Sequence, residues 1–554
     1  MMLVSSAIFY INKLKKKIDW KLLVFLLLFL NVKLEIKFPV IILFTLLQFN
    51  FKFGFSLKNS RLPLFYLLMM AIAIINWFIG KSYTDLNYTV VLLTGIGFWI
   101  LCILAVHQVK LAVEQNQPAV IHQTILVFFI INALFSLGNL AVIFLDSHAI
   151  NPYTYQGQLQ KYFISTGDYV KGVTFDTSTT NAVLSAFGVI YFLTRKNAPM
   201  LLVCMATMLL TGSNFINIVI LLIFLLLFVF RTDRFQKSLV VVCLVFLGVF
   251  MAKISPQNNK YTTDTIKILL HKDPSAPKPS VWDYTPIRLK PDSILTPDEL
   301  KQKAATIFID DAYAAAHPPK RSIIAKPVDT VYVKEGGRIA IKGANINSPA
   351  YQSSTQTPRG EIQLARFIDT HKKYLPISGK EILTPRVDTP GKVIGFLQTT
   401  RFLRTHLNRA IAGIGVGNFS SKLAFRATGL GFAGGYPHQF IYISHDFMVN
   451  HLDLYLNYFS KRAGYHSLTN SPFSVYDQLL AEYGLIGLLA FVIYYLGFFA
   501  KQYKTLTYGL PVLLLMLAAF FIEYWFEQLS VMVFFELLLL LNIKENQPLK
   551  TVKQ

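Results

Sequence analysis

The sequence predicts a mainly α protein: a polytopic transmembrane helical bundle of about 12 spans, with one large extracytoplasmic loop domain between spans 9 and 10. Of its 554 residues, 53% are hydrophobic and only 15% are charged, whereas about a quarter of the residues in soluble proteins carry a charge. Apolar blocks of roughly 15–25 residues recur toward both ends of the chain, close to the length that a helix needs to cross about 30 Å of hydrocarbon. A long, mostly polar stretch separates the two groups of blocks.

Each apolar block is expected to be a helix, because in lipid a helix satisfies all of its own backbone hydrogen bonds. The first two blocks are short, and a hairpin that enters the membrane without crossing it is an alternative for them. The expected spans are residues 20–32, 38–51, 62–80, 88–106, 121–146, 180–194, 198–212, 214–230, 237–253, 478–500, 506–523 and 527–542. They define an N-terminal bundle of about 9 spans (1–253), an outer loop domain (254–476), and about 3 C-terminal spans with a tail (477–554).

Clusters of Lys and Arg predict the orientation of these spans. They flank alternate spans, from Lys13–Lys17 before the first to Lys544–Lys553 after the last, and with this span count they fall on one side. Lys33 and Lys37 are an exception. Because short cytoplasmic loops are rich in Lys and Arg, both termini are expected in the cytoplasm and the large loop outside. No small-residue cleavage site follows Leu22–Leu30, which predicts an uncleaved signal anchor.

The net charge of +23 favours an anionic partner outside the membrane. Nucleic acid is a poor partner there, whereas an anionic lipid head group or a pyrophosphate fits a basic outer domain. Cys102, Cys204 and Cys243 all fall within expected spans. The outer domain is therefore expected to need no disulfide and to hold no zinc through cysteine.

Four elements are expected within the outer loop. Thr296-Pro297 begins a helix that runs to about Ala316, because threonine caps a helix and proline suits its first position. Residues 320–357 are expected to form a small strand pair, and 360–375 a second helix. A third, amphipathic and basic helix is expected from Thr389-Pro390 to about Asn408, suited to lying on a membrane surface or on the spans.

Alternating glycines follow this helix in the run Gly413-Ile-Gly-Val-Gly-Asn-Phe-Ser420. Glycines allow tight turns and close backbone approach, and Asn418 is a candidate cap for a following helix. Exposed amides in such a loop can bind phosphate oxygens. A purely structural turn is the favoured alternative, since nucleotide-binding fingerprints have a different spacing.

Ionisable residues enter the tenth expected span. The segment from Asn470 to Gly487 places Tyr476, Asp477 and Glu482 at or near the outer end of this span. Burial of a charge in a span costs several kcal/mol unless the charge is paired, so such residues are candidates for function.

Together, the glycine run and the Gln-Leu-Leu-Ala-Glu-Tyr-Gly-Leu-Ile-Gly-Leu segment resemble the O-antigen ligase/polymerase superfamily. These are bacterial inner-membrane glycosyltransferases with about 12 spans and one large periplasmic loop near the C-terminus. The architecture resembles theirs along the whole chain, and the specific residues lie mainly in 391–490. Weaker similarities lie at Gly172–Asn181 and at Thr211-Gly212-Ser213-Asn214.

The resemblance implies a glycan donor on undecaprenyl pyrophosphate, polymerised or transferred on the periplasmic side for surface polysaccharide biosynthesis, without metal or cofactor. The acceptor would be another glycan, a lipid A core, or a protein hydroxyl. Membrane lipids, a chain-length regulator and a flippase are further implied partners. A base would take the proton from the acceptor hydroxyl, and basic residues would hold the pyrophosphate, so that positioning and charge neutralisation dominate catalysis.

Several positions depart from the family pattern. The usual His-Asn pair falls on Phe473-Ser474, so the candidate base is His466, whose reference pKa is near neutral. Its rivals are His438, His445 and His451, and Asp477 and Glu482 are alternative bases or orienting groups. Glu482 as a structural partner for a hydroxyl or a backbone amide is an equal alternative.

The expected anion-binding positions also differ from the family. The loop arginine falls on Lys392, which can bind phosphate as a point charge but not as a fork. An arginine is also missing at Ser213-Asn214. The candidate pyrophosphate- and glycan-binding residues are Lys392, Arg401, Arg404, Gly415, Gly417, Asn418, Ser213 and Asn214, with a further arginine at Arg409.

Two other classes of function stay open at the level of sequence. A polysaccharide or lipid-linked glycan transporter is one, but the division into nine and three spans shows no paired halves. A non-catalytic membrane scaffold is the other, because the histidine is missing at position 473.

Overall fold

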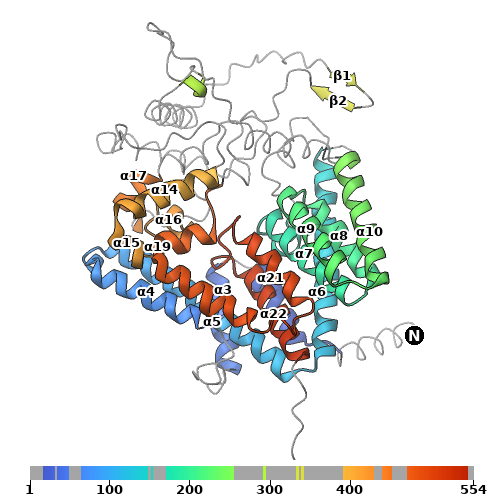
Figure 1. The fold of residues 1–554 in the computed structure, drawn as a ribbon, viewed down its shortest axis with the longest axis horizontal. Coiled ribbons are helices and arrows are strands. Elements are labelled where there is room, and N and C mark those ends of the chain that lie inside the picture. The colour runs from blue at the N-terminus through green and yellow to red at the C-terminus, as the bar shows by residue number, and fades with distance from the viewer. Residues whose placement is uncertain are drawn as a thin grey trace, which may run out of the picture.

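The computed structural model describes residues 17–31, 34–48, 64–147, 151, 153, 170–254, 291–294, 332–335, 338–341, 391–428, 440–451 and 471–546. These residues are mostly helical, as the composition predicts. In Figure 1 the helices form one bundle, with a group of shorter helices at one end of it.

The first group of helices precedes the large loop. It consists of α2 (Trp20–Asn31), α3 (Leu34–Gln48), α4 (Phe65–Ile79), α5 (Leu86–Gln115), α6 (Pro118–Ser147), α7 (Ser178–Thr194), α8 (Ala198–Leu210), α9 (Asn214–Phe230) and α10 (Arg234–Val249). Single turns of tighter or wider helix lie at η1 (Ser82–Thr84), η3 (Gly172–Thr174), η4 (Phe250–Ile254) and η5 (Asp292–Ile294).

The second group lies in the C-terminal part of the chain. It consists of α14 (Gly391–Thr405), α15 (Leu407–Ala412), α16 (Lys422–Ala427), α17 (His445–Asn450), α19 (Val475–Ala490), η8 (Phe491–Leu496), α20 (Gly497–Ala500), α21 (Gly509–Ala519) and α22 (Leu529–Glu545).

Within the described ranges, four helical segments are long and apolar enough to cross a membrane: Leu86–Gln115, Pro118–Leu145, Arg234–Ile254 and Val475–Ala500. Shorter apolar helices accompany them, and α2 has only 12 residues. At about 1.5 Å per residue, α2 would span roughly 18 Å, less than the hydrocarbon thickness. The chain thus has the helices of a membrane protein, while the count of 12 spans stays a prediction.

Polar residues at the helix ends explain where several helices begin. The Asp85 carboxylate accepts hydrogen bonds from the N–H groups of Asn87 and Tyr88, which caps α5. Asp233 and Gln236 form a reciprocal capping box at the start of α10. These caps satisfy backbone donors that a first helical turn leaves free, so the boundaries follow from local sequence.

Helix α22 forms the centre of the bundle. Its residues 529–542 are all buried, and it packs against α5, α7, α21 and α2. Phe534 contacts Phe128 and Phe129 of α6, with ring centroids 4.7 and 5.2 Å apart. A helix that is mostly apolar all round belongs in an interior, and α22 packs against helices from both groups of the chain.

Long-range hydrogen bonds distinguish the two ends of the bundle. At one end, here called the loop end, Asn76 of α4 donates to the Ala412 carbonyl and Asn87 of α5 donates to the Ile441 carbonyl. At the other, here called the tail end, Lys544 donates to the carbonyls of Val113, Glu114 and Asn116. Helices α14 to α17 lie at the loop end in Figure 1.

The described parts of the large loop confirm two expected elements. Strands β1 (Tyr332–Glu335) and β2 (Arg338–Ile341) pair antiparallel, with Tyr332 opposite Ile341, as the expected strand pair in 320–357. The third expected helix is divided into α14 and α15, with His406 between them. The two helices expected at 296–316 and 360–375 lie outside the described residues.

Candidate functional site

The glycine loop and helix α19 are joined through one carboxylate. Glu482 of α19 is fully buried. Its Oε2 accepts a hydrogen bond from the Gly417 N–H at 2.7 Å, and its Oε1 accepts from the N–H groups of Phe419, Ser420 and Ser421 at 3.2, 3.1 and 2.9 Å. Four backbone donors therefore surround a single side chain.

Backbone contacts complete this junction. The Ile414 N–H donates to the Ala481 carbonyl at 3.0 Å, and the Gly415 N–H donates to the Glu482 carbonyl at 3.1 Å. Gly484 breaks the regular geometry of α19, with φ 68° and ψ −167°. The break lets the loop pair with the helix backbone just before it.

Glycine is required at both sides of the junction. Gly413 has a φ of 83°, and a Cβ there would lie 2.3 Å from the Glu482 carbonyl oxygen. A Cβ on Gly484 would lie 2.5 Å from the Gly413 nitrogen. Both values are far below an ordinary contact, and positive φ disfavours other residues. The two glycine-containing motifs, far apart in sequence, are thus two halves of one backbone contact.

This geometry favours the structural alternatives for the glycine run and for Glu482, and it corrects one expectation, that Asn418 caps the following helix. The Gly415 amide donates to the Glu482 backbone carbonyl and the Gly417 amide to the Glu482 carboxylate, so oxygens of the same chain lie where phosphate oxygens were expected. Glu482 is likewise occupied by four donors, which favours its structural role over that of a base. Asn418 does not cap α16, because the Ser421 hydroxyl accepts from the Ala424 N–H at 3.0 Å in that position.

Asn418 instead ties the loop to the segment that precedes α17. Its Nδ2 donates to the Ile414 carbonyl at 3.0 Å, and its Oδ1 accepts from the Tyr442 hydroxyl at 2.9 Å. The Ser444 hydroxyl donates to the Asn418 carbonyl. All of these contacts are internal, so Asn418 shapes the loop.

A group of ionisable side chains lies next to this junction. We call it the ionic cluster and define it as Lys392, Lys422, Asp477, Glu523 and Glu527. Their electrostatic interactions link α14, α16, α19 and the connection between α21 and α22. Burying charge among apolar helices costs free energy unless the charges are paired. Such a concentration of ionisable residues is therefore a candidate functional site.

Lys392 extends from α14 into the interior, where only 7% of its surface is exposed. Its Nζ donates to the Phe473 carbonyl at 2.6 Å and to the Ile522 carbonyl at 3.1 Å. Burial lowers the pKa of Lys392 to about 7, although the nearby carboxylates of Glu523 and Asp477 oppose this shift. The predicted phosphate-binding lysine is therefore present in the cluster, held between two carbonyls.

Asp477 precedes Glu482 by five residues in α19, but its carboxylate is not fully hydrogen-bonded. It is 3% exposed, and its Oδ1 has no hydrogen-bond partner. Burial raises the pKa of Asp477, and the Thr399 hydroxyl of α14, which is itself buried, opposes part of this rise. A buried oxygen with unused acceptor capacity is a rare and costly feature, and it fits a group that awaits a ligand.

Glu523 and Glu527 complete the acidic side of the cluster. Gln478 donates through Nε2 to Glu527 Oε1 at 2.9 Å, while Glu527 Oε2 and the Gln478 amide oxygen have no partner. Burial raises the pKa of Glu527 to about 8, reinforced by Glu482 and opposed by Arg426 and Lys422. Burial also raises the pKa of Glu523 above its ordinary value, while Lys422 and Lys392 lower it.

Sequence reasoning missed Lys422, Glu523 and Glu527. A signal was available, because two carboxylates in a short outer connection fall at the same end as Asp477. Their meeting with Lys422 depends on the position of α16, which no periodicity reveals.

The predicted histidines divide into three cases. His451 is buried, its Nδ1 lies 2.8 Å from Gln398 Oε1, and burial lowers its pKa to about 3. It is therefore neutral and packs against Phe419, 4.1 Å between ring centroids. His445 is exposed at the start of α17. His466 and His438 lie outside the described residues.

The remaining predicted anion-binding residues lie around the cluster. Arg401 is half-buried on α14, whereas Arg404 is exposed. Ser213 precedes α9, where its side chain makes no capping hydrogen bond, and Asn214 is the first residue of that helix. Helix α9 packs against α21, which leads to Glu523. These residues thus come from α14 and from the start of α9.

The weak similarity at Gly172–Asn181 has a structural explanation. Asn132 donates to Asn181 Oδ1 at 2.8 Å, and Asn181 donates to the Val170 carbonyl at 2.9 Å. Gly172 adopts a φ of 64° beside them. The turn places Asp176 near enough to Glu523 to raise the pKa of Glu523 slightly, so this segment borders the ionic cluster.

In chemical terms, the cluster offers two ammonium groups, three carboxylates and several unpartnered oxygens within a mainly apolar surrounding. Such a set can hold an anionic group and accept a proton from a hydroxyl. Among the described residues, no group of three His, Cys, Asp or Glu side chains has the arrangement of a metal site. No family model, curated protein or solved structure matches the chain.

Proposed function

We propose that this protein is a glycosyltransferase of the O-antigen ligase/polymerase type, which transfers or polymerises undecaprenyl-pyrophosphate-linked glycan units at the outer face of a bacterial inner membrane. One observation carries the proposal: the ionic cluster, with its unpartnered buried oxygens, lies at the loop end of an apolar helical bundle. A lipid-linked anionic donor needs a charged site at the membrane boundary, because its lipid stays in the bilayer while its pyrophosphate lies at the surface. A soluble substrate does not need its site at that position.

The reaction would use the cluster in two ways. The acceptor hydroxyl oxygen forms a bond to the anomeric carbon, the bond from that carbon to the pyrophosphate oxygen breaks, and the hydroxyl proton passes to a carboxylate. Asp477 is the described residue best suited to accept the proton, because its Oδ1 has unused acceptor capacity. Lys392 and Lys422 would neutralise charge on the leaving pyrophosphate.

Glu482 would support this chemistry indirectly. By holding four loop amides, it fixes the position of α16 and hence of Lys422 relative to α19. Positioning of this kind is a large part of catalysis when the leaving group is already good. His466, in the part of the loop outside the described residues, stays an alternative base.

The finer topology belongs to the same proposal. Helices α2 to α10 are nine in order, and α19 (continued by η8 and α20), α21 and α22 follow the large loop. This order supports 12 spans, cytoplasmic termini and a periplasmic loop. The hydrogen bonds at the loop and tail ends are consistent with alternating helix directions.

A complementation test in the native bacterium addresses the proposal. The gene is deleted, and wild-type, Asp477→Asn or Lys392→Gln protein is supplied at equal membrane levels, with surface polysaccharide read on gels. Loss of long chains with a single lipid-linked unit accumulating would indicate a polymerase, and long lipid-linked chains that never reach an acceptor would indicate a ligase. Unchanged polysaccharide and no lipid-linked intermediate in the deletion strain would contradict both.

A further inference from the structure

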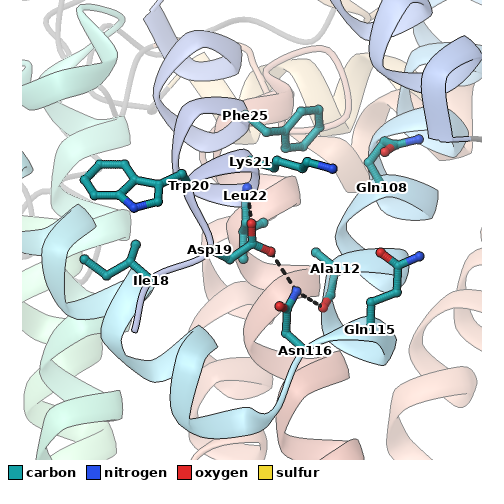
Figure 2. Close-up of a pocket in the computed structure, with 10 residues that line it drawn as sticks. All are labelled: Ile18, Asp19, Trp20, Lys21, Leu22, Phe25, Gln108, Ala112, Gln115 and Asn116. Atoms are coloured by element: carbon teal, nitrogen blue, oxygen red, sulfur yellow. Dashed lines mark hydrogen bonds between the residues drawn. The ribbon is translucent and has the colours of Figure 1, made fainter. Parts of the chain in front are cut away.

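A second polar cavity lies at the tail end, opposite the ionic cluster. It has a volume of about 310 Å³ and opens between the start of α2 and the last turns of α5 (Figure 2). Its lining combines polar side chains with an aromatic rim: Ile18, Asp19, Trp20, Lys21, Phe25, Gln108, Gln115 and Asn116. It shares no residue with the candidate site, so it needs its own explanation.

The acidic residue that lines this cavity, Asp19, already has hydrogen-bond partners within the protein. The Asp19 carboxylate accepts from the Leu22 N–H at 3.1 Å and from Asn116 Nδ2 at 2.7 Å. The same Asn116 nitrogen donates to the Ala112 carbonyl at 2.9 Å. These bonds fix α2 against α5 and use the negative charge of Asp19 for structure.

Lys21 supplies positive charge to the cavity. Figure 2 shows its side chain extending between Phe25 and Gln108, on the opposite side of the cavity from Asn116. Among the described residues, it forms no ion pair of 4 Å or less. Gln108, only 7% exposed, lines the same cavity, and its Nε2 lies 3.4 Å from His107 Nδ1. An ammonium and an amide that line one cavity are suited to the oxygens of a phosphate.

The tail end as a whole favours an anionic ligand. Its described basic residues are Lys17, Lys21, Lys110, Arg195, Lys196, Arg231, Arg234, Lys237, Lys501, Lys504 and Lys544. Its described acids are fewer, and Glu114, Asp233 and Glu545 are each in an ion pair with one of these residues or with His122. The resulting positive potential attracts negatively charged lipid.

An apolar face beside the cavity indicates the source of the phosphate. Trp20 is 44% exposed and Val24 is 39% exposed, and both lie on one face of α2 because they are four residues apart. Tryptophan is enriched at membrane–water interfaces. A free phosphate would use the lysine alone, whereas a phospholipid would use the lysine and this apolar face together.

We propose that this cavity binds the headgroup of an anionic phospholipid. The headgroup phosphate contacts the Lys21 ammonium and the Gln108 amide, and an acyl chain lies along Trp20 and Val24. The site is independent of the proposed glycosyltransferase activity, and would serve to hold α2 against α5 in the inner leaflet.

The test uses Trp20 as its own reporter. Full-length protein is reconstituted in phosphatidylcholine vesicles containing a small fraction of brominated phosphatidylglycerol, and in matched vesicles with brominated phosphatidylcholine instead. The Trp20 contribution is the difference in quenching between wild type and Trp20→Phe. We expect stronger quenching by the brominated phosphatidylglycerol, and a relative affinity for it that falls about fivefold in Lys21→Gln.

Lys501→Gln is the matched control, since Lys501 is an exposed lysine at the same end but away from the cavity. An equal loss in both variants would show general surface attraction and overturn the proposal. Equal quenching by the two brominated lipids would do the same. Inorganic phosphate is added in a further arm, and reversal of the quenching by millimolar phosphate would assign the site to a free anion instead of a lipid.

Discussion

The two ends of the bundle differ in how completely their carboxylates are hydrogen-bonded. At the tail end, Glu545 is surrounded by partners: His122 at 2.5 Å, Tyr508 at 2.9 Å and Arg195 at 3.2 Å. At the loop end, Asp477 and Glu527 each retain a carboxylate oxygen without a partner. Full pairing is what structural stability requires, and its absence is costly. The contrast supports the proposal that the loop end holds the reactive carboxylates.

The same contrast occurs within one helix at the loop end. Glu482 and Asp477 are five residues apart in α19, and both are buried. Glu482 accepts four backbone hydrogen bonds, while Asp477 has an unused oxygen. Substitution of Glu482 should therefore lower stability, whereas substitution of Asp477 should lower activity.

Replacing Glu482 should have the largest effect. Glu482→Ala leaves four buried N–H groups without an acceptor, and we expect a loss of about 3–5 kcal/mol in stability, with activity lost as well. Glu482→Gln retains one acceptor oxygen and should lose less. Thermal unfolding of the purified protein measures both, with Lys501→Gln, an exposed substitution at the tail end, as the control. A stable Glu482→Ala protein would remove the distinction between the two carboxylates.

Replacing Asp477 should affect activity rather than stability. Asp477→Asn keeps the shape and removes the base, so transfer should fall roughly 10²–10⁴-fold. The unfolding temperature should stay the same or rise, because a buried charge is removed. In vitro transfer from a lipid-linked donor, measured beside thermal unfolding, checks both expectations. Wild-type transfer by Asp477→Asn would exclude this residue as the base and favour His466.

Gly413→Ala tests how much the backbone contact between the glycine loop and α19 contributes to stability. The strained φ and the close Glu482 carbonyl should together cost about 1–3 kcal/mol or more. Gly97→Ala in α5 is a matched control, because nothing lies within 4 Å of its Cβ position. The control should be neutral or stabilised by up to about 1 kcal/mol. Equal unfolding temperatures for the two variants would contradict the close contact.

The smallest expected effect is a pH dependence of stability that arises at the loop end. The pKa of Glu527 is raised to about 8 in the folded protein, above its unfolded value. The folded state then binds more protons, so the contribution of Glu527 is full below the unfolded pKa and is lost as pH rises toward 8. Unfolding temperatures from pH 5 to 8 should fall less steeply in Glu527→Gln than in the wild type.

Lys392 should change the pH dependence of stability in a higher pH range than Glu527 does. Its folded pKa of about 7 lies below the unfolded value, so the unfolded state binds more protons between these two values. Stability should therefore rise with pH above about 7, and Lys392→Met should remove this rise. An unchanged pH profile in Lys392→Met would place this lysine in a more hydrated setting.

Local sequence was sufficient for much of the fold. Apolar blocks gave the helices, and Asp85 and Asp233 act as ordinary caps that depend only on residues two or three positions away. The strand pair followed from composition. The break at His406 was missed, since a continuous amphipathic pattern does not show where the chain must turn to meet α19.

The candidate site could be predicted only in part. Asp477 was found because an ionisable residue in a span is conspicuous, and Lys392 because it falls where the resembled family has its loop arginine. The engagement of the glycine loop by Glu482 was left open, because that contact joins positions 65 residues apart. The same reason explains why Glu523, Glu527 and Lys422 were missed. They come together only because α16, α19 and the connection between α21 and α22 meet in the folded protein.

The loop-to-helix junction also has a consequence for biosynthesis. The Gly417 amide leaves the ribosome 65 residues before the carboxylate that will bind it. At translation rates of about 5–20 residues per second, the glycine loop waits roughly 3–13 s for its partner. During that interval its amides can be satisfied only by water or by a folding helper, so formation of α19 is the step that completes the loop end of the bundle.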